Sequence, residues 1–582
     1  MNPAQLLENF DRISEAPDAV AQLRRFILDL AVRGELVEQD PDDEPAAELL
    51  KQIQAEKARL VKEGSLKKAK LTLPIRDDEQ PFSTPVQWQF VRLGDVLEMI
   101  NGRAFKPTDW LDRGLPIVRI QNLNNVQALF NYCDPGTVDD RHLIRDNEFL
   151  ISWSGTPGTS FGAFIWKRGF AALNQHIFRC IQIGDAFWPD FLRLAINSQL
   201  DVLISKAQGG VGLQHVTKGT LEALPLPLPP LAEQHRIVAK VDELMALCDQ
   251  LEVAKNEREA RCDRLVAASL HRISTAAADE AATEAQSAIP LRDAARFHLD
   301  HLPRLTTHAE HIKQLRQTIL NLAVRGRLVP QDPNDEPASA TVDLVSKEAM
   351  KAVQAGVIRR YGLDEPVDDS GLSELPPGWR WSRLVEITRP VPYAIKRGPF
   401  GSAIRKDMFV PKGFKVYEQQ HAISGDFTKG RYYITEAKFE ELRAFELHPN
   451  EILVSCSGTV GKVAVVPASI ERGVINQALL KLSLHESTLR NEYFLILFPA
   501  FFMVTETLTD LQGTAQKNIP GMEILKKMPF PLPPLAEQHR IVAKVDELMA
   551  LCDQLEAQLT TTQTDSRRLL EAVLHEALAA AV

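Results

Sequence analysis

The sequence predicts an α+β chain in which two mixed α/β domains are separated by two long antiparallel coiled-coil helices, arranged as a pseudo-twofold repeat. Three observations support this prediction. The 26 residues PLPPLAEQHRIVAKVDELMALCDQLE occur identically at 227–252 and at 531–556. A second pair of segments, 23–46 and 315–338, agrees at 18 of 24 positions. The segments that lie between these repeats are far more divergent, so the two halves share a framework and differ in what it carries.

Each half begins with a helical block. The segments LAVRGELV and LAVRGRLV predict a helix that ends near Gly34 or Gly326, because glycine often follows the last turn of a helix. An Asp-Pro turn follows, and a new helix is predicted to start near Glu44 or Glu336. The predicted order is a helical block (1–82), domain 1 (83–228), a long helix (229–275), a linker with a second helical block (276–376), domain 2 (377–532) and a second long helix (533–582).

The identical repeat combines a proline run with an apolar seam. The prolines favour an extended segment that leads into a helix. Apolar residues then recur at spacings of 4 and 3, as at positions a and d of a coiled coil. The predicted helix seam consists of Ile237, Val241, Leu244, Cys248 and Leu251, and of Ile541, Val545, Leu548, Cys552 and Leu555. We expect the two helices, each of ~44 residues and ~66 Å, to pair with each other. The alternative is that each helix packs only on its own domain.

Weak similarities connect the two divergent domains. The segment SGTPG at 154–158 corresponds to SGTVG at 457–461, and Asn174-Gln175 corresponds to Asn476-Gln477. Each SGTxG segment follows an apolar run, which predicts a strand that leads into a glycine turn. Both domains are therefore predicted to be mixed α/β folds of ~150 residues.

The charge is distributed unevenly along the chain. The net charge of −10 is unusual for a nucleic-acid-binding protein. Residues 86–224 contain 13 basic and 13 acidic residues, and residues 377–530 contain 20 and 15, so the rest of the chain carries −15. No apolar run approaches the ~20 residues that cross a bilayer, and the N-terminus does not resemble a signal peptide. We therefore expect a cytoplasmic protein without a membrane partner.

The sequence contains few signs of catalysis. It has no GxxxxGK[ST] loop, no HExxH helix and no GxSxG elbow. The six cysteines are scattered and form no CxxC pair, which indicates neither a zinc site nor a disulfide framework. The acidic runs 41–44 and 333–336 are predicted to be structural turns, and His235 and His539 to be packing or surface residues. No catalytic, cofactor-binding or metal-binding residue is predicted in this chain.

The two divergent domains contain side chains suited to DNA. Asparagine and glutamine can pair bidentately with adenine, arginine can pair with guanine, and glycine loops allow close approach to phosphate. The candidate DNA-binding residues of domain 1 are Arg103, Lys106, Arg119, Gln121, Asn122, Asn124, Ser154, Thr156, Gln214 and His215. Those of domain 2 are Lys396, Arg397, Ser402, Lys406, Gln419, Gln420, Ser457, Thr459, Lys517 and Asn518. For each single residue, the alternative is a solvated loop position.

The order of these parts resembles the type I restriction–modification specificity (S) subunits. The two PLPPLAEQHRIVAKVDELM segments and the two LAVRGxLVxQDP segments carry the resemblance. Within the domains, residues 101–125 and 396–409 are similar to two forms of the target-recognition domain of that family. The resemblance covers nearly the whole chain, which is long for the family, and the extra length falls in the helical blocks and the linker.

The resemblance implies a division of labour between several proteins. Each target-recognition domain would bind one half of a bipartite, asymmetric site in double-stranded DNA, and the long helices would set the spacing. Two methyltransferase (M) subunits, which use S-adenosylmethionine, would dock on the helical regions. Restriction (R) subunits would add ATP- and Mg-dependent translocation and cleavage. The chain itself would bind no cofactor and catalyse no reaction. The alternatives are a non-catalytic protein scaffold and a fused restriction enzyme with its own active site.

Overall fold

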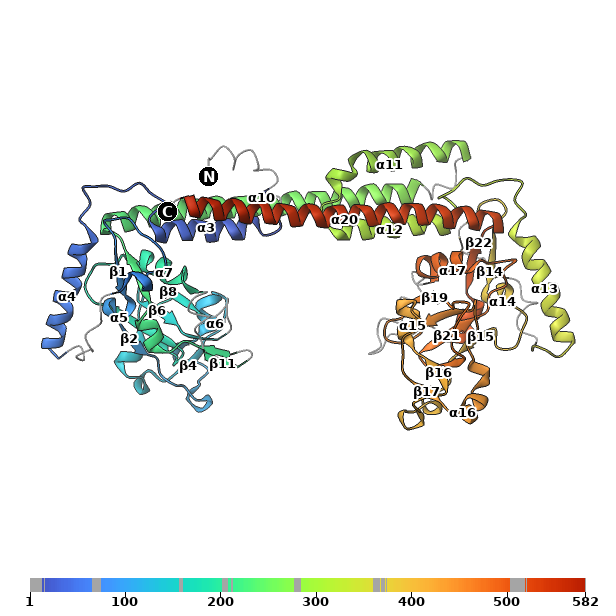
Figure 1. Ribbon diagram of the computed structural model, residues 1–582, viewed down its shortest axis with the longest axis horizontal. Coiled ribbons are helices and arrows are strands. Elements are labelled where there is room, and N and C mark those ends of the chain that lie inside the picture. Colours follow the sequence, from blue (N-terminus) through green and yellow to red (C-terminus); the bar gives the residue numbers. More distant parts are fainter. Residues whose placement is uncertain are drawn as a thin grey trace. The chain divides into compact units, whose positions relative to one another are not determined.

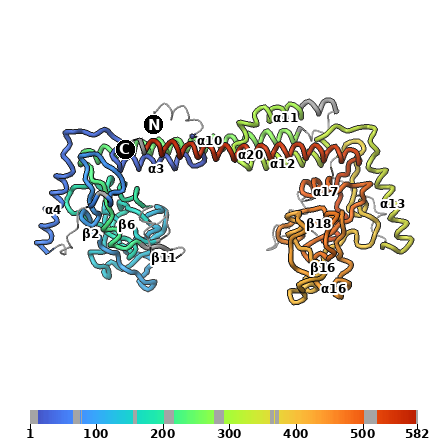
Figure 2. Tube along the Cα trace, in the orientation of Figure 1, coloured from blue at the N-terminus to red at the C-terminus, as the bar shows by residue number. Residues whose placement is uncertain are grey.

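The computed structural model describes residues 13–14, 16–64, 75–155, 161–200, 208–210, 213–276, 284–359, 367, 372, 374–502, 519 and 521–580. The chain divides into two compact units. Unit 1 comprises Met1–Glu257 and Thr562–Val582, and unit 2 comprises Arg258–Thr561. Each unit contains one mixed α/β domain together with helices from both halves of the sequence (Figures 1 and 2).

The helices of the two units correspond to each other. Unit 1 contains α3 (Ala19–Arg33) and α4 (Ala46–Lys62), and unit 2 contains α11 (Glu284–Leu305), α12 (Ala309–Val324) and α13 (Ala338–Gln354). Helix α3 ends as predicted, because Gly34 adopts the left-handed conformation with φ of 78° and donates its N–H to Leu30. Helix α12 ends at Val324, and Gly326 has φ of 65°. Helices α4 and α13 start two residues after the predicted positions.

Domain 1 consists of short strands in three sheets and a closing strand pair. Its strands are β1 (Gln89–Arg92), β2 (Leu97–Asn101), β3 (Leu115–Val118), β4 (Asn131–Cys133), β5 (Leu143–Ile144), β6 (Phe149–Ser152), β7 (Ser154–Gly155), β8 (Gly162–Ile165), β9 (Ala171–Leu173), β10 (Ile177–Gln182), β11 (Gln208–Gly210), β12 (Leu213–His215) and β13 (Pro225–Leu228). Its helices are α5 (Leu93–Val96), α6 (Ile120–Asn124), α7 (Pro189–Asn197) and α9 (Lys218–Glu222). The sheets have the strand orders β2-β10-β6-β8, β4-β3-β9-β5 and β11-β12-β7.

Domain 2 repeats this plan with different residues. Its strands are β14 (Arg380–Arg383), β15 (Ile395–Arg397), β16 (Phe414–Tyr417), β17 (Tyr433–Ile434), β18 (Ile452–Ser455), β19 (Val463–Val465), β20 (Gly473–Ile475), β21 (Leu479–Leu482) and β22 (Pro529–Leu532). Its helices are α14 (Leu384–Ile387), α15 (Gln419–Ser424), α16 (Glu436–Glu441), α17 (Asn491–Leu497) and α19 (Met522–Lys527). The sheets have the orders β15-β21-β18-β19 and β17-β16-β20.

The two domains share strand order and strand direction. In the sheets β2-β10-β6-β8 and β15-β21-β18-β19 the strand pairs are antiparallel, whereas in the other sheets β3 pairs with β9, and β16 with β20, in parallel. In each domain the first and last strands form an antiparallel pair, β1 with β13 and β14 with β22. The proline runs therefore form the last strand of each domain before the long helix begins. The predicted α+β class and the repeat of two mixed α/β domains are confirmed.

The identical repeats begin the two long helices, α10 (Leu231–Ala276) and α20 (Leu535–Ala580). Their ends lie within two residues of the predicted ends, 275 and 582. Each long helix begins in one unit and ends in the other, and the two helices do so in opposite order.

The first part of the apolar seam has a partner that differs from the predicted one. Ile237, Val241 and Cys248 are buried together with residues of α3, such as Ile27 and Ala31. Ile541, Val545 and Cys552 are buried with α12 in the same way, and Leu244, Leu548 and Leu555 pack at the margins. Leu251 is 44% exposed. A 4-3 spacing indicates a helix packed along another helix, but it does not identify the second helix. Over this stretch of each unit, the helix of the LAVRG segment lies along the long helix, as the ion pairs Arg24–Asp249 and Arg316–Asp553 also show, and residues of the mixed domain complete the core.

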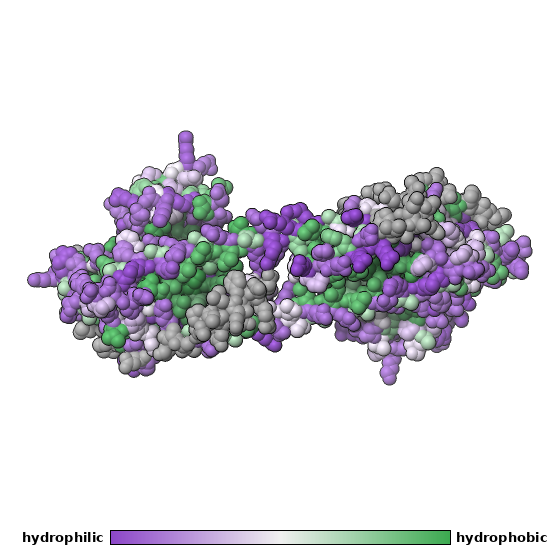
Figure 3. Space-filling model, turned by 90° about the horizontal axis from the view of Figure 1, so that it is seen from above, coloured by the Kyte–Doolittle hydropathy of each residue, from purple (hydrophilic) through white to green (hydrophobic). Residues whose placement is uncertain are grey.

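The described helices and cysteines agree with the predictions from composition. None of the described helices is long and apolar enough to span a membrane. Hydrophilic side chains cover much of the face drawn in Figure 3. All six cysteines are free. Cys248 and Cys552 are buried in the helical cores, as predicted, and burial raises the pKa of both thiols.

Candidate nucleic-acid interface

A buried glutamate fixes each mixed domain to its helical block. In unit 1, Glu233 at the start of α10 accepts hydrogen bonds from Trp88 Nε1 at 2.9 Å and from Gln39 Nε2 at 2.6 Å. Trp88 lies just before β1, and Gln39 follows the LAVRG helix, so one carboxylate joins three segments that are distant in sequence. We call this arrangement a glutamate clasp. Gln39 also donates to the carbonyl oxygen of Gly34, which links the clasp to the end of α3.

Unit 2 contains the same glutamate clasp at equivalent positions. Glu537 accepts hydrogen bonds from Trp379 Nε1 at 2.9 Å and from Gln331 Nε2 at 2.6 Å. Both glutamates are at most 1% exposed, and burial raises the pKa of both carboxyl groups. A carboxylate that is buried and saturated with donors from its own fold is a structural group rather than a general acid or base.

The residue after each clasp glutamate closes the domain from the other side. Gln234 accepts a hydrogen bond from the backbone N–H of Trp188 at 2.7 Å and donates to the carbonyl oxygens of Ala186 and Pro229. Gln538 accepts from the N–H of Arg490 at 2.9 Å and donates to Thr488 and Pro533. Sequence reasoning missed these roles. The signals were present in the Glu-Gln pair of the identical repeat and in the spacing of Pro85 to Trp88 and Pro376 to Trp379.

The acidic runs and the histidines of the repeat have structural contacts. Asp43 forms an ion pair with Arg236 at 2.6 Å, and Asp335 forms one with Arg540 at 2.7 Å. These contacts confirm that the acidic runs are structural turns. The His235 ring lies 4.2 Å from the Trp188 ring between centroids, with the two planes tilted by 48°, and the Nε2 of His539 lies 2.8 Å from Arg490.

Two equivalent turns carry several of the candidate DNA-binding residues. One turn joins β3 to α6 in domain 1, and the other joins β16 to α15 in domain 2. Asn122 accepts from the N–H of Arg119, and His421 accepts from the N–H of Glu418, so each side chain caps its own short helix. Asn122 also donates to the carbonyl oxygens of Ala128 and Leu129.

The position of Asn122 corrects one prediction. This residue is only 2% exposed, and its amide is fully used in folding the turn. It is therefore a structural residue, and a base contact from it is not expected. An asparagine that fixes a turn and an asparagine that contacts a base look the same in a sequence, because both lie in polar loops.

The neighbouring residues of these turns are more accessible. Gln121, Asn124 and Gln420 are exposed, and Gln419 is half-buried. Arg119 is half-buried, with its guanidinium over the Trp110 ring at 5.9 Å from the centroid. Gln420 donates a hydrogen bond to Glu418. The residue of domain 1 at the position equivalent to Glu418 is Arg119, since each of the two precedes the short helix of its turn. The same turn therefore has a cation in one domain and a carboxylate in the other.

The Asn-Gln similarity marks a tight contact in each domain. A Cβ atom on Gly102 would lie 2.1 Å from the carbonyl oxygen of Asn174, and one on Gly398 would lie 1.8 Å from that of Asn476. These glycines follow the edge strands β2 and β15. Only glycine allows the two backbones to approach so closely. Gln175 and Gln477, which follow in the turns, are exposed.

Basic side chains lie next to these glycines. Arg103 donates to the carbonyl oxygen of Thr137 and lies over the Phe105 ring. Lys396 lies over the rings of Tyr393 and Phe445, and Arg397, also on β15, is half-buried. Lys106, Ser402 and Lys406 are exposed in short 3-10 turns.

The SGTxG segments differ between the domains. Ser154 is buried in β7 and lies opposite His215 of β12 in the strand pair. A phosphate contact from Ser154 is therefore not expected. Ser457 and Thr459 lie in a half-exposed turn, and the carbonyl oxygen of Ser457 accepts a hydrogen bond from Gln419. Thr156, Lys517 and Asn518 lie outside the described residues, as do the side chains of Gln214 and His215.

The number of basic residues in domain 2 overstates the number of accessible cations. Lys415 and Lys481 are 1% and 3% exposed, and they pair with Glu471 and Glu451 at 3.0 Å. Buried lysines that are neutralised in this way contribute little to attraction of a phosphate backbone. The accessible cations of domain 2 are therefore the ones on and near β15 and on the loops, rather than all 20.

The comparisons with known proteins agree with this arrangement. The family model described as type I restriction modification DNA specificity domain matches residues 85–258 and 403–562. The EcoAI specificity subunit of Escherichia coli is 29% identical over 96% of this chain and 94% of its own length. The EcoDI specificity subunit of Escherichia coli is 34% identical over 85% of this chain and 88% of its own length.

A solved structure gives a weaker match. A chain from a study of complex assembly and conformational transition of the type I R-M system is 20% identical, with a TM-score of 0.44. This match covers 85% of the present chain and 99% of the other. The family model matches more than half of the sequence, once in each half, and each match contains one of the clasp glutamates, Glu233 or Glu537. The chain belongs to the family of type I restriction–modification DNA specificity subunits.

Proposed function

We propose that this chain is the DNA-reading subunit of a type I restriction–modification complex and that it recognises a bipartite, asymmetric site in double-stranded DNA. The observation that carries this proposal is the contrast between the two halves. Identical clasps and the same strand order hold domains 1 and 2, yet equivalent turns of the two domains carry different side chains. Two copies of one scaffold with unlike contact surfaces suit two unlike half-sites.

The accessible candidates divide into two kinds of contact. Gln121, Asn124, Gln420 and the half-buried Gln419 carry amides that can pair with adenine, and Arg119 can pair with guanine. Lys106, Lys396, Arg397 and Lys406 suit phosphate contacts, which give affinity and register rather than sequence preference. Arg119 and Glu418 occupy equivalent positions in the two domains. They support different base preferences of domains 1 and 2, since a guanidinium donates hydrogen bonds and a carboxylate accepts them.

The exposed face of the identical repeat supports docking of two copies of one partner. Its residues are the same at α10 and α20 although the fold does not require it. Leu247 and Leu551 are 47% and 48% exposed, and each lies beside an ion pair, Lys240–Glu243 or Lys544–Glu547, at 2.9 Å. Equal surfaces favour equal partners. We propose two M subunits there, with R subunits joining through them.

The chemistry would then reside in the partners. S-adenosylmethionine would be bound by the M subunits, and ATP and Mg by the R subunits, while this chain would bind neither and would catalyse no step. The carboxyl groups of Glu233 and Glu537, whose pKa values burial raises, accept the hydrogen bonds of the clasps, which supports a non-catalytic role for them.

Sequencing of methylated adenines in DNA treated with the assembled S–M complex tests the proposal. We expect methylation at a split, asymmetric site, and no methylation by the purified chain alone. A chain in which domain 2 is replaced by that of another family member should alter one half-site and preserve the other. Methylation by this chain without a partner, or a target altered in both halves by the exchange, would contradict the proposal.

A double variant separates DNA reading from a scaffold role. Lys396→Ala with Arg397→Ala should weaken DNA binding by the assembled complex and reduce its dependence on salt. Lys347→Ala with Lys351→Ala is the matched control, because it removes two exposed cations from α13, outside the domains. Equal binding by all three complexes, with assembly intact, would favour the scaffold alternative.

A further inference from the structure

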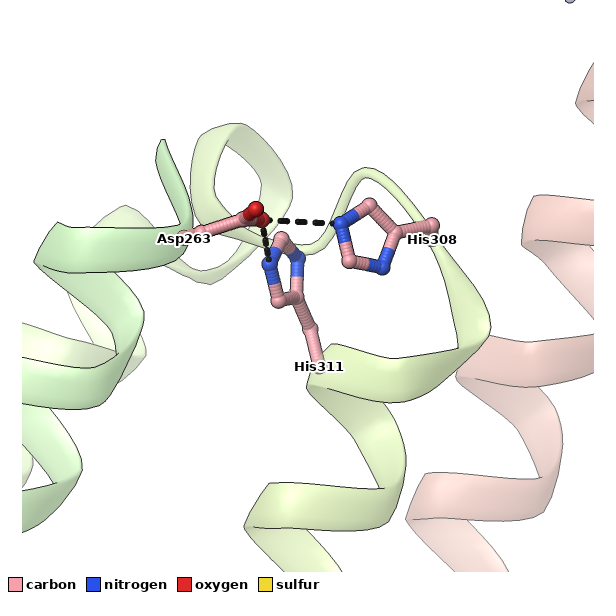
Figure 4. A group of neighbouring side chains, drawn as sticks. All are labelled: Asp263, His308 and His311. Atoms are coloured by element: carbon pink, nitrogen blue, oxygen red, sulfur yellow. Dashed lines mark hydrogen bonds and ion pairs between the residues drawn. The ribbon is translucent and has the colours of Figure 1, made fainter. Parts of the chain in front are cut away.

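An Asp-His-His cluster lies in unit 2, away from the candidate DNA-binding residues. Asp263 comes from α10, His308 immediately precedes α12, and His311 lies in the first turn of α12 (Figure 4). The Nε2 atoms of His308 and His311 lie 2.9 and 2.8 Å from the same Oδ1 atom of Asp263. Among the described residues, this is the one group in which three such ligand atoms lie within 4.8 Å of one another.

The cluster rests on a packed apolar base that fixes its geometry. Val266 and Leu270 of α10 are buried against Ala294 and Leu305 of α11. At the start of α12, the N–H of His311 donates a hydrogen bond to the carbonyl oxygen of His308. His311 itself is 2% exposed at its side chain, whereas Asp263 is 53% exposed and His308 is 40% exposed. Two ligands are therefore held on a rigid helix start, and the cluster opens to solvent on one side.

We propose that Asp263, His308 and His311 form a binding site for a divalent transition-metal ion, with Zn²⁺ as the best match. Two imidazole nitrogens and one carboxylate oxygen are a ligand set that suits zinc, and calcium and magnesium prefer all-oxygen sites. Zinc–ligand bonds of roughly 2.0–2.2 Å require the three atoms to move apart by a few tenths of an ångström. Solvent reaches the exposed side, so water supplies the fourth ligand.

Metal binding must displace the protons that now join the cluster. The N–H of Thr307 donates to Nδ1 of His311 at 3.3 Å, which places the proton of this ring on Nε2, facing Asp263. When a zinc ion binds Nε2, the ring proton must lie on Nδ1 instead, and the Thr307 contact, already at the long end for a hydrogen bond, is given up. The ring of His308, whose Nε2 lies 2.9 Å from the same carboxylate oxygen, must make the same change of tautomer before Nε2 can bind the metal.

The equivalent place in unit 1 has a different composition. Aligning the two halves through their repeats sets Ala16 and Ala19 against His308 and His311, and Arg567 against Asp263. Ala16 and Ala19 are buried in an apolar cluster with Leu570, and Arg567 pairs with Asp18 at 3.5 Å. The ligand set is thus not a by-product of the shared scaffold. The site would join α10 to the start of α12 within unit 2, at the position where the chain has extra helical sequence. The proposal differs from the sequence-based prediction that the chain has no metal-binding residue, which considered the HExxH motif and cysteine patterns.

The test uses the full-length chain after treatment with a chelator. Titration with Zn²⁺ in a calorimeter should give one ion per chain, and Co²⁺ should give the visible absorption of a four-coordinate site. His308→Ala should lower zinc affinity by at least about 100-fold, because changes outside the ligand set already cost 10- to 100-fold. His301→Ala, an exposed histidine of α11, is the matched control and should bind as the unmodified chain does.

Asp263→Asn provides a second variant at an exposed position, should His308→Ala disturb folding. It keeps a side-chain oxygen for the histidines but lacks the carboxylate charge, and it should also lose the Co²⁺ spectrum. No binding by the unmodified chain, or unchanged zinc affinity in both ligand variants, would overturn the proposal. Loss of affinity in His301→Ala equal to that in His308→Ala would overturn it as well.

Discussion

The glutamate clasp makes a prediction that can be worked out from its contacts. Glu537→Ala removes the acceptor of two buried donors, Trp379 Nε1 and Gln331 Nε2. A buried donor without a partner costs about 1–3 kcal/mol. The substitution also removes a carboxylate whose burial is itself unfavourable, as its raised pKa indicates. We therefore expect a net loss of about 3 kcal/mol in the local stability of unit 2.

Hydrogen exchange with mass spectrometry on the full-length chain measures this loss by segment. The strand pair β14–β22 adjoins the clasp, and its amides should exchange about 150-fold faster in the variant, at 1.36 kcal/mol per factor of ten. The pair β1–β13 of unit 1 should exchange at its normal rate. Glu233→Ala is the matched control, because the same substitution in the other copy should reverse the pattern.

Two results would refute this reasoning. Equal acceleration in both strand pairs would mean that the clasp affects the chain globally rather than its own domain. No acceleration in either pair would mean that water replaces the carboxylate and satisfies both donors. The first of these outcomes concerns the division into two units, and the second concerns the energetic weight of the clasp.

Three other outcomes follow from the structure. Gly326→Ala should destabilise unit 2 more than Gly356→Ala does, as measured by thermal unfolding of the two variants. Both glycines have a positive φ, but a Cβ atom on Gly326 would lie 2.6 Å from Pro376, whereas a Cβ atom on Gly356 would have no neighbour within 4 Å. The raised pKa values of Glu233 and Glu537 add stability that is present below pH ~4.5 and is lost as pH rises through the folded-state pKa. The free energies of unfolding of the chain and of its double Glu→Gln variant should therefore differ by an amount that changes with pH. Leu551→Asp should leave one bound M subunit instead of two in native mass spectrometry, with Ala557→Asp, at a nearby exposed position of α20 beyond the identical repeat, as the control.

The sequence predicted the large parts of this fold because repeats and periodic patterns encode them directly. The long helices follow from an apolar spacing that persists over many turns, and the helix ends at Gly34 and Gly326 follow from a conformation that favours glycine. The partner of the seam could not be predicted in this way. Ile237 and Ile541 would make the same pattern against any helix, and the choice of α3 and α12 depends on contacts between segments distant in sequence.

The candidate DNA-binding residues show a second limit of sequence reasoning. Gln121 and Asn122 are adjacent polar residues, yet one is exposed and the other is buried with all its hydrogen bonds made by the turn. Lys415 and Lys481 add to the basic count of domain 2 but are neutralised inside it. Polarity in a sequence indicates that a group needs partners. Whether the protein or a ligand supplies them depends on three-dimensional packing.

The identity of the two repeats has two separate causes, which the structure distinguishes. Glu233, Gln234 and Arg236 are held by contacts with the domain and the helical block, so folding alone explains why Glu537, Gln538 and Arg540 match them. Folding does not explain Leu247 and Leu551, which are exposed and contribute no described core contact. A recent duplication would explain both sets, but it would also preserve the flanking segments. Those diverge at once, at Val253 and Ala557. The identity ends at Glu252 and Glu556, shortly before the two helices leave their own units after Glu257 and Thr561, and a shared partner on the exposed face is the explanation that we favour.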